Sequence, residues 1–445
     1  MQIPSALFGR AADVEHVCQC AASGACCSIV GVSNLGKSAL LRTICDPSKP
    51  AAQGPTFVYV DCNRMPERTA RAFFITTWHA VMTRLPTAEL RAGAQHVYDA
   101  MVAASGAMMV TLYFDAGVIF ALDHLPRPLV LCFDEFDESY QNLEQQTFLN
   151  LRALRDRHGS ALVYVTATDR ELARLTQSRE QGEFYELIAP RVQFLRLMEP
   201  DDTRRFCADY GARARVSFSE DDLAFIRENA DGHPGLVQAV CYALGAVTGE
   251  PVRNKHQDRM IHQYVRENLA ADPNVQTECA KIWRDLEPDE HEALLHLHRA
   301  NPTSANDAGR RGLRNKFIID DDEDEPHIFS RLFENFVHQQ KIVSQPDKRG
   351  VYIDVDAGDV WVDGKQIEPL TDLEYRLVLF LYGRLDRVCD KYAIVENVWG
   401  EEYIDKVDDT RIEKLVSRVR AKIEADPAHP RYLTSLRGRG YKLTR

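Results

Sequence analysis

Residues 25–41 read Ala25-Cys26-Cys27-Ser28-Ile29-Val30-Gly31-Val32-Ser33-Asn34-Leu35-Gly36-Lys37-Ser38-Ala39-Leu40-Leu41, and the architecture follows from them. An apolar run predicts a buried β-strand, and apolar residues at helical spacing follow it. Between the two, the pattern G-x-x-x-x-G-K-S lets backbone N–H groups converge on phosphates at a helix N-terminus. In this pattern Lys37 reaches the β- and γ-phosphates and the Ser38 hydroxyl ligates Mg²⁺. The candidate nucleotide-binding residues here are Gly31, Asn34, Gly36, Lys37, Ser38 and Ala39.

A second motif supplies carboxylates for the same site. Pro128-Leu129-Val130-Leu131-Cys132-Phe133-Asp134-Glu135 is an apolar run, typical of a buried strand, that ends in two acids. We expect Asp134 to hold Mg²⁺ through water and Glu135 to polarise the attacking water, with Lys37 as the other catalytic candidate. An ordinary strand followed by an acidic turn is the alternative. Together the two motifs predict ATP and Mg²⁺ as cofactors and a slow, regulatory hydrolysis of ATP to ADP and phosphate.

A third apolar run, Ala161–Arg170, also ends in polar side chains. Thr168 or Arg170 is placed to sense the γ-phosphate, although a threonine at a strand end is as often only a cap. Three such runs, separated by helical patterns, predict an α/β fold with a parallel sheet and helices on both faces.

The C-terminal part of the chain differs from the rest in charge. Residues 409–445 hold ten Lys/Arg against four Asp/Glu, a net charge of +6, whereas the whole chain carries −12, which leaves −18 for residues 1–408. Asp409–Glu424, wound as a helix at about 100° per residue, has one apolar face and one basic face. A helix of this kind fits the major groove of DNA. A solvated charged face is the alternative.

Residues 349–445 resemble the effector domain of OmpR/PhoB-type response regulators. Strands over 351–355 and 359–364 precede a capping box of Thr371 and Glu374, and the helix is followed by an Arg-Gly-x-Gly-Tyr hairpin, in the order the family has them. The resemblance implies a winged helix that binds double-stranded DNA. The residues it implies for DNA contact are Arg411, Lys414, Ser417, Arg418, Arg420, Ser435 and Arg437, and the basic face and the hairpin tip add Lys422 and Arg439.

Within this set the resemblance makes Arg418 the residue that reads a base. Arg420 projects away from the basic face and is an alternative brace for the helix. Leu415 stands where relatives often carry a polar reading residue, so the sequence of the DNA site stays open.

Residues 5–345 resemble the STAND/AAA+ class of P-loop ATPases. Leu7-Phe8-Gly9-Arg10 is similar to the class's N-terminal box beside the adenine, which makes Arg10 a candidate nucleotide contact. Gly232-His233-Pro234 resembles the Gly-x-Pro motif of the helical lid, where Pro234 packs against the nucleotide. A plain helix-cap turn is the alternative for that segment.

A second winged helix is expected over residues 276–345, with helices at 279–286 and 288–300. The acidic run from Asp320 to Glu325 at its hairpin tip would repel a phosphate backbone, so this copy is expected to be structural or regulatory. STAND switches often carry a Met-His-Asp motif here, whose histidine clamps ADP. This chain has Ile328-Phe329-Ser330, which weakens the expectation of an ADP-locked state.

The motifs divide the 445 residues into four expected domains. These are the P-loop ATPase (1–200), the helical lid (201–275), the central winged helix (276–345) and the OmpR/PhoB-type winged helix (346–445). The N-terminus shows no secretory signal, the most apolar window contains Asp115, and eleven cysteines favour a reducing compartment. We therefore expect a cytoplasmic protein without a membrane partner. A metal or redox role for Cys18, Cys20, Cys26 and Cys27 is the lesser alternative.

The sequence predicts an ATP-dependent, DNA-binding transcriptional regulator, in which ATP binding and hydrolysis switch the C-terminal winged helix. A nucleotide-dependent homo-oligomer and RNA polymerase are the expected protein partners. One alternative is an AAA+ ATPase of origin-recognition or defence type that assembles on DNA. Another is a nucleotide-binding scaffold with constitutive DNA binding.

Overall fold

The computed structural model describes residues 7–46, 48, 54–247, 255–297, 306–320, 326–340, 350–354, 359–363, 365–368, 370–400, 407–436 and 438–444. The chain forms two compact units, Met1–Gln339 and Gln340–Arg445. This division lies near the predicted boundary at 345/346. The finer boundaries at 200/201 and 275/276 stay predictions.

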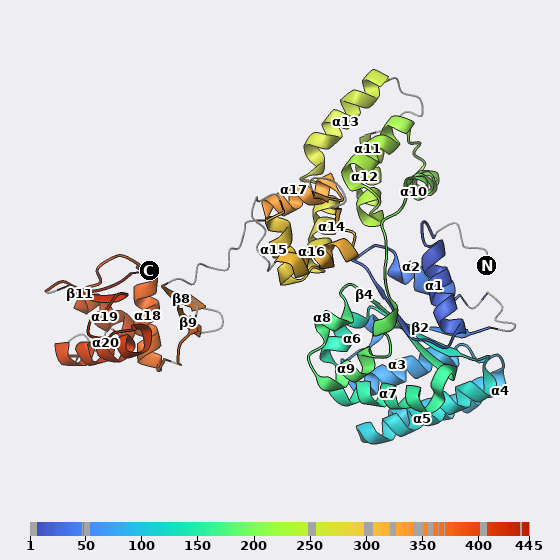
Figure 1. The fold of residues 1–445 in the computed structure, drawn as a ribbon, viewed down its shortest axis with the longest axis horizontal. Helices are drawn as coiled ribbons and strands as arrows, with labels where there is room; N and C mark the ends of the chain where they lie inside the picture. The colour runs from blue at the N-terminus through green and yellow to red at the C-terminus, as the bar shows by residue number, and fades with distance from the viewer. Residues whose placement is uncertain are drawn as a thin grey trace. The chain divides into compact units, whose positions relative to one another are not determined.

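The first unit is built on a five-stranded parallel sheet (Figure 1). Its strands are β1 (Cys27–Val30), β2 (Thr56–Asp61), β3 (Leu129–Asp134), β4 (Leu162–Thr168) and β5 (Val192–Phe194), in the order β2-β3-β4-β1-β5. Every residue of β1, β3 and β4 is buried, as in a parallel sheet whose two faces are covered. Because all pairings are parallel, the strands end at one edge, where α/β folds bind ligands. The predicted α/β class is confirmed.

Helices surround this sheet. They are α1 (Ala11–Ala22), α2 (Lys37–Ile44), α3 (Ala70–Met82), α4 (Ala88–Ala103), α5 (Ala107–His124), α6 (Phe136–Asn142), α7 (Gln145–His158), α8 (Leu172–Leu175) and α9 (Arg179–Tyr185). Within the described part of the chain, α5 is the one helix long and apolar enough to cross a membrane, criteria that core helices also meet. It packs against α3 and α4. A Cβ at Gly117 would lie 2.9 Å from the Trp78 ring, so the close contact of α5 with α3 requires glycine there.

A helical region follows the sheet. Its first four helices are α10 (Pro200–Ala214), α11 (Glu220–Ala230), α12 (Pro234–Val247) and α13 (Lys255–Leu269). Three more helices, α14 (Pro273–Arg284), α15 (Pro288–Leu295) and α16 (Asn306–Asn315), lead into the hairpin β6 (Ile319–Asp320)–β7 (His327–Ile328) and then α17 (Arg331–Gln339). Three helices and a hairpin are the elements of the expected central winged helix. The predicted helix over 288–300 ends earlier, at Leu295, and the acidic tip at 321–325 lies outside the described residues.

The second unit has the predicted winged-helix order. An antiparallel sheet of β8 (Val351–Asp354), β9 (Asp359–Val362) and β10 (Lys365–Gln366) is followed by α18 (Asp372–Tyr382), α19 (Lys391–Val398), α20 (Asp409–Ile423) and the hairpin β11 (Leu433–Leu436)–β12 (Gly440–Leu443). Thr371 and Glu374 form the predicted capping box at the start of α18. The apolar face of α20 is buried in the core of this unit, as its periodicity predicts.

Candidate nucleotide site and DNA interface

The glycine-rich loop joins β1 to α2 at the carboxyl edge of the sheet. Gly36 precedes the first residue of α2 with a φ of 102°, in the left-handed region that glycine adopts without strain. Asn34 also has a positive φ, of 60°. The loop therefore curls onto the N-terminus of α2, the arrangement that presents backbone N–H groups to an anion.

Lys37 is buried, and its ammonium is fully engaged. It donates hydrogen bonds to the carbonyl oxygens of Gly31 (2.6 Å) and Val32 (3.2 Å) and to the carboxylate of Asp169 (2.5 Å). Burial alone would lower the pKa of Lys37, but the Asp169 carboxylate outweighs it and the pKa lies above its ordinary value. Asp169 follows β4, which is the neighbour of β1 in the sheet. The end of β4 therefore lies beside the P-loop, and the Asp169 carboxylate can contact Lys37.

Asp134, at the end of β3, has one carboxylate oxygen with a partner and one without. Its Oδ2 accepts a hydrogen bond from the Tyr59 hydroxyl at 2.6 Å. Its Oδ1 and the hydroxyl of Thr168 are buried and have no hydrogen-bond partner among the residues that the structure describes. A buried carboxylate oxygen requires a partner, and a divalent cation is a suitable one. The free Asp134 oxygen therefore fits a Mg²⁺ ligand, and the Ser38 hydroxyl as a second ligand stays a prediction.

The acids that follow β3 have different environments. Glu135 has a φ of 53°, and burial together with the charge of Asp169 raises its pKa to about 6. Asp137 accepts the backbone N–H groups of Asp169 and Arg170 at 3.0–3.1 Å, and burial raises its pKa to about 6 as well. Asp137 thereby fixes the loop after β4 and is not free to act on water, whereas the role of Glu135 as general base stays a prediction.

Arg10 supports the loop from the N-terminal side. Its guanidinium is buried, donates to the carbonyl oxygen of Leu35 at 2.6 Å and lies 3.6 Å from the carboxylate of Asp13. A cavity of about 610 Å³ opens beside it, lined by the N-terminal box and α10. A direct contact between Arg10 and a nucleotide stays a prediction.

His233, directly before α12 in the predicted lid, reaches the same loop. This side chain is fully buried; its Nδ1 accepts the N–H of Leu236 (3.3 Å), which leaves Nε2 to donate to the carbonyl oxygen of Ser33 (3.1 Å). Burial lowers the pKa of His233 to about 4, so the ring is neutral at pH 7. Pro234, the predicted nucleotide contact, lines a cavity of about 410 Å³ together with Asn34.

Sequence reasoning missed Asp137, Asp169, His233 and Asp285 as site residues. Asp169 directly follows a predicted strand, and its place at the carboxyl edge was the available signal. Asp285 accepts a hydrogen bond from the Ser33 N–H but lies 252 residues away in the sequence, so no local pattern marks it. All eleven cysteines are free, and the described residues contain no group of three or more His, Cys, Asp or Glu side chains that could hold a metal ion.

In the second unit, α20 presents four of the candidate DNA contacts to solvent. These are Arg411, Lys414, Ser417 and Arg418. Leu415 is fully buried in the core, so it is not a reading residue. Arg439 is exposed on the hairpin, and Arg437 lies outside the described residues.

The other three candidates are engaged within the unit. Arg420 donates to the carbonyl oxygen of Leu433 and to the Ser435 hydroxyl, both at 2.8 Å, and so ties α20 to the hairpin. Lys422 donates at 2.8 Å to Glu374, which is buried and also lies 3.8 Å from Arg418. These contacts support a bracing role for Arg420, Ser435 and Lys422.

Comparison with known proteins identifies the first unit. The family model described as "Novel STAND NTPase 1" matches residues 4–357. The chain belongs to the novel STAND NTPase 1 family. The Walker-type ATPase paby2304 of Pyrococcus abyssi has a TM-score of 0.47 and 12% identity, over 75% of this chain and 96% of that one.

The second unit of this STAND NTPase is an OmpR/PhoB-type DNA-binding domain. The family model "Transcriptional regulatory protein, C terminal" matches residues 364–443. The sensory transduction protein RegX3 of Mycobacterium tuberculosis is 39% identical over 94 residues, which are 21% of this chain and 40% of RegX3. The transcriptional regulatory protein YrkP of Bacillus subtilis is 38% identical over 84 residues, 19% and 36% of the two chains. The chain thus spans less than half of these relatives.

We expect the STAND NTPase unit to lose stability in acid because His233 must stay neutral where it is buried. Its pKa is about 4 in the fold, against an ordinary value of 6.5, so the unfolded chain takes up the proton first. The stabilisation is complete above about pH 6.5 and falls by about 2 kcal/mol at pH 5. Calorimetry at pH 7.5 and 5 should show a smaller loss of melting temperature for His233→Gln than for the wild type.

His96→Gln, on the exposed face of α4, is the matched control and should lose as much melting temperature as the wild type. A loss in His233→Gln equal to that of the wild type would show that the buried ring does not cause the acid sensitivity.

Proposed function

We propose that this STAND NTPase is an ATP-dependent transcriptional regulator, in which the nucleotide state of the first unit controls DNA binding by the second. The observation that carries the proposal is the contact of the P-loop with distant helices. His233 of the lid and Asp285 after α14 both hydrogen-bond to Ser33. A nucleotide that alters the P-loop must therefore alter contacts with the helices that lead to the DNA-binding unit.

The nucleotide is ATP with Mg²⁺ in this proposal. Lys37 binds the β- and γ-phosphates, aided by the backbone of Gly31, Asn34, Gly36 and Ala39, while Ser38 and Asp134 hold the cation. Mg²⁺, when bound, neutralises phosphate charge. Glu135 orients the water for a slow hydrolysis that resets the switch, and Thr168 faces the terminal phosphate.

DNA is read by the exposed face of α20. Arg418 takes the base-reading position, with Arg411, Lys414 and Ser417 beside it, and Arg439 contacts phosphate from the hairpin. A nucleotide-dependent homo-oligomer acts on RNA polymerase in the cytoplasm. The relatives of the second unit are named as transcriptional regulators, which supports transcription as the output.

Lys37→Ala should bind ATP far more weakly, because it removes the cation aimed at the β- and γ-phosphates. Glu135→Gln should bind ATP like the wild type and release phosphate slowly. Isothermal titration calorimetry and a phosphate-release assay measure the two effects. Equal ATP affinity in the wild type and Lys37→Ala would remove the nucleotide site from the proposal.

ATP with Mg²⁺ should tighten specific DNA binding through a coupling free energy of about 1–3 kcal/mol. The measurement is a binding isotherm on a duplex selected from a random library, at one salt concentration, for the nucleotide-free, ADP and ATP forms. One affinity for all three forms would instead favour a scaffold with constitutive DNA binding. Assembly on DNA without sequence preference would favour the origin-recognition or defence type of ATPase.

Arg418→Ala should cost about 1–3 kcal/mol on the selected duplex and relax the preference at one base pair. Arg420→Ala should weaken selected and scrambled duplexes alike, because its guanidinium holds the hairpin and not a base. Lys414→Ala serves as a phosphate-type control that lowers the salt dependence by about one unit. A base preference that changes in Arg420→Ala and not in Arg418→Ala would reverse the two roles.

A further inference from the structure

A carboxylate of the chain itself lies on the P-loop. Asp285 follows the last residue of α14, and its Oδ2 accepts a hydrogen bond from the backbone N–H of Ser33 at 2.6 Å. The side chain is only 4% exposed, so water does not replace the interaction. The neighbouring loop residue is held in a similar way, since the Asn34 amide donates to the Glu278 carboxylate at 2.7 Å.

Asp285 lies at the end of the P-loop that Lys37 serves. The charges of Lys37 and Asp169 both act on the Asp285 carboxyl, and burial together with Asp169 raises its pKa. Lys37 in a P-loop reaches the β- and γ-phosphates. The chain's own carboxylates thus occupy two donors of the P-loop, because Asp169 accepts from the Lys37 ammonium and Asp285 accepts from the Ser33 N–H.

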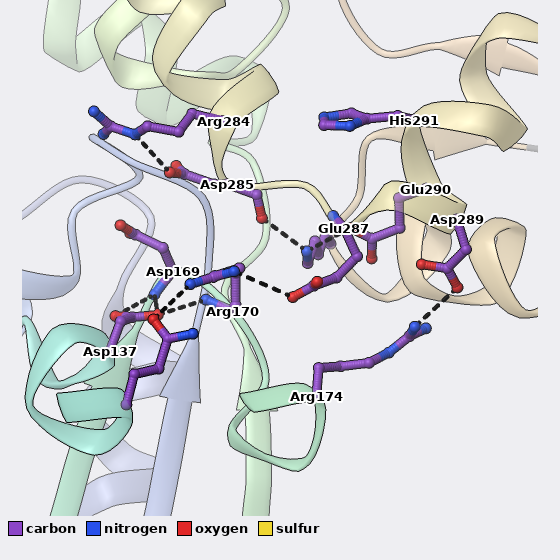
Figure 2. Close-up of polar contacts among 12 residues, drawn as sticks. Asp137, Asp169, Arg170, Arg174, Arg284, Asp285, Glu287, Asp289, Glu290 and His291 are labelled. Carbon is purple, nitrogen blue, oxygen red and sulfur yellow. Dashed lines mark hydrogen bonds and ion pairs between the residues drawn. The ribbon is translucent and has the colours of Figure 1, made fainter. Parts of the chain in front are cut away.

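A rigid support holds Asp285 in this position. The acidic loop, defined here as residues 285–290, runs from the end of α14 into the first turn of α15 and faces Asp169 and Arg170 (Figure 2). Lys316 donates to the Asp285 carbonyl oxygen at 3.1 Å and to the Glu290 carboxylate at 2.7 Å, and both side chains are buried. Breaking a buried pair of this kind is costly, so the loop keeps one conformation as long as it stays docked.

Two arginines after β4 bind the other side of the acidic loop. Figure 2 shows Arg174 directed at Asp289 and Arg170 directed at Glu287, with distances of 2.8 and 3.8 Å. Arg170 also donates to Gln141 at 3.0 Å, so it is anchored in the ATPase. The acidic loop is therefore bound to the same strand end that carries Asp169.

We propose that Asp285 selects against a nucleoside triphosphate, because its carboxylate occupies a backbone N–H of the P-loop whose lysine reaches the terminal phosphates. A carboxylate and a phosphate are both anionic acceptors that favour this N–H, and one N–H cannot serve both. The triphosphate binds only when Asp285 leaves, and the acidic loop, tied to α16 through Lys316, leaves with it. The inference rests on the proposed nucleotide site and adds the residue that links the terminal phosphate to the central helices.

The decisive variant is Asp285→Ala. It should bind the non-hydrolysable triphosphate AMP-PNP, with Mg²⁺, about 10-fold or more tightly than the wild type, since a hydrogen bond to a charged group no longer has to be displaced. Affinity for ADP should rise less. Isothermal titration calorimetry of the full chain gives both constants. Glu292→Ala, an exposed acid on α15, is the matched control and should change neither.

Asp285→Asn keeps the size of the side chain and protects the test against misfolding. It should tighten AMP-PNP binding to a smaller extent, because an amide oxygen still accepts the Ser33 N–H. Hydrogen exchange of wild-type residues 285–295 should become faster when AMP-PNP binds. Unchanged or weaker AMP-PNP binding by Asp285→Ala, equal tightening for ADP, or slower exchange on binding would each overturn the proposal.

AMP-PNP binding and DNA binding, measured together, distinguish a failure of this inference from a failure of the proposed function. If Asp285→Ala binds AMP-PNP more tightly but the DNA affinity of the wild type does not depend on nucleotide, Asp285 selects the nucleotide as proposed and the transcriptional switch fails. If DNA affinity follows nucleotide while Asp285→Ala binds AMP-PNP like the wild type, the switch stands and the role of Asp285 fails.

Discussion

A buried ammonium requires an anion, and the nucleotide site of this protein depends on how that requirement is met at Lys37. The lysine is 4% exposed and stays charged because Asp169 lies against it. The sheet order makes this possible, since β4 separates the strand of the P-loop from the strand that ends in Asp134. A polyphosphate brings several negative charges to the same ammonium, so the nucleotide and the chain's own carboxylates compete for one cation.

Other buried carboxyl groups near Asp169 make this competition stronger. Glu135, Asp137 and Asp285 all have raised pKa values, with burial as the first cause and the charge of Asp169 as the second. Adding a polyphosphate to this group of acids increases the repulsion unless a cation arrives with it. Among the described residues, the Asp134 Oδ1 is a buried carboxylate oxygen without a hydrogen-bond partner, which is the kind of group that receives a cation. The electrostatics thus favour a nucleotide that arrives with Mg²⁺ over a bare anion.

Local patterns predicted most of the fold, and long-range contacts account for what they missed. The strand, loop and helix around Lys37, the strand ending in Asp134 and the order of elements around α20 all follow from periodicity and motif spacing. Helical periodicity also placed Lys422 on the basic face of α20, but its long side chain reaches back to Glu374. Asp285 and His233 meet Ser33 only because the helices fold back over the sheet, which no local pattern encodes.

The central helices that contact the nucleotide loop also form the end of the first unit. Lys316, after α16, holds the Asp285 backbone, while Ser330, before α17, donates to the Asn229 carbonyl oxygen of the lid at 2.7 Å. The next residue, Arg331, pairs with Glu228 at 2.7 Å. Helix α17 ends at Gln339, where the first unit ends. Any rearrangement that frees Asp285 therefore acts on the body that ends in α17, and Ser330 and Arg331 hold the start of that helix against Asn229 and Glu228.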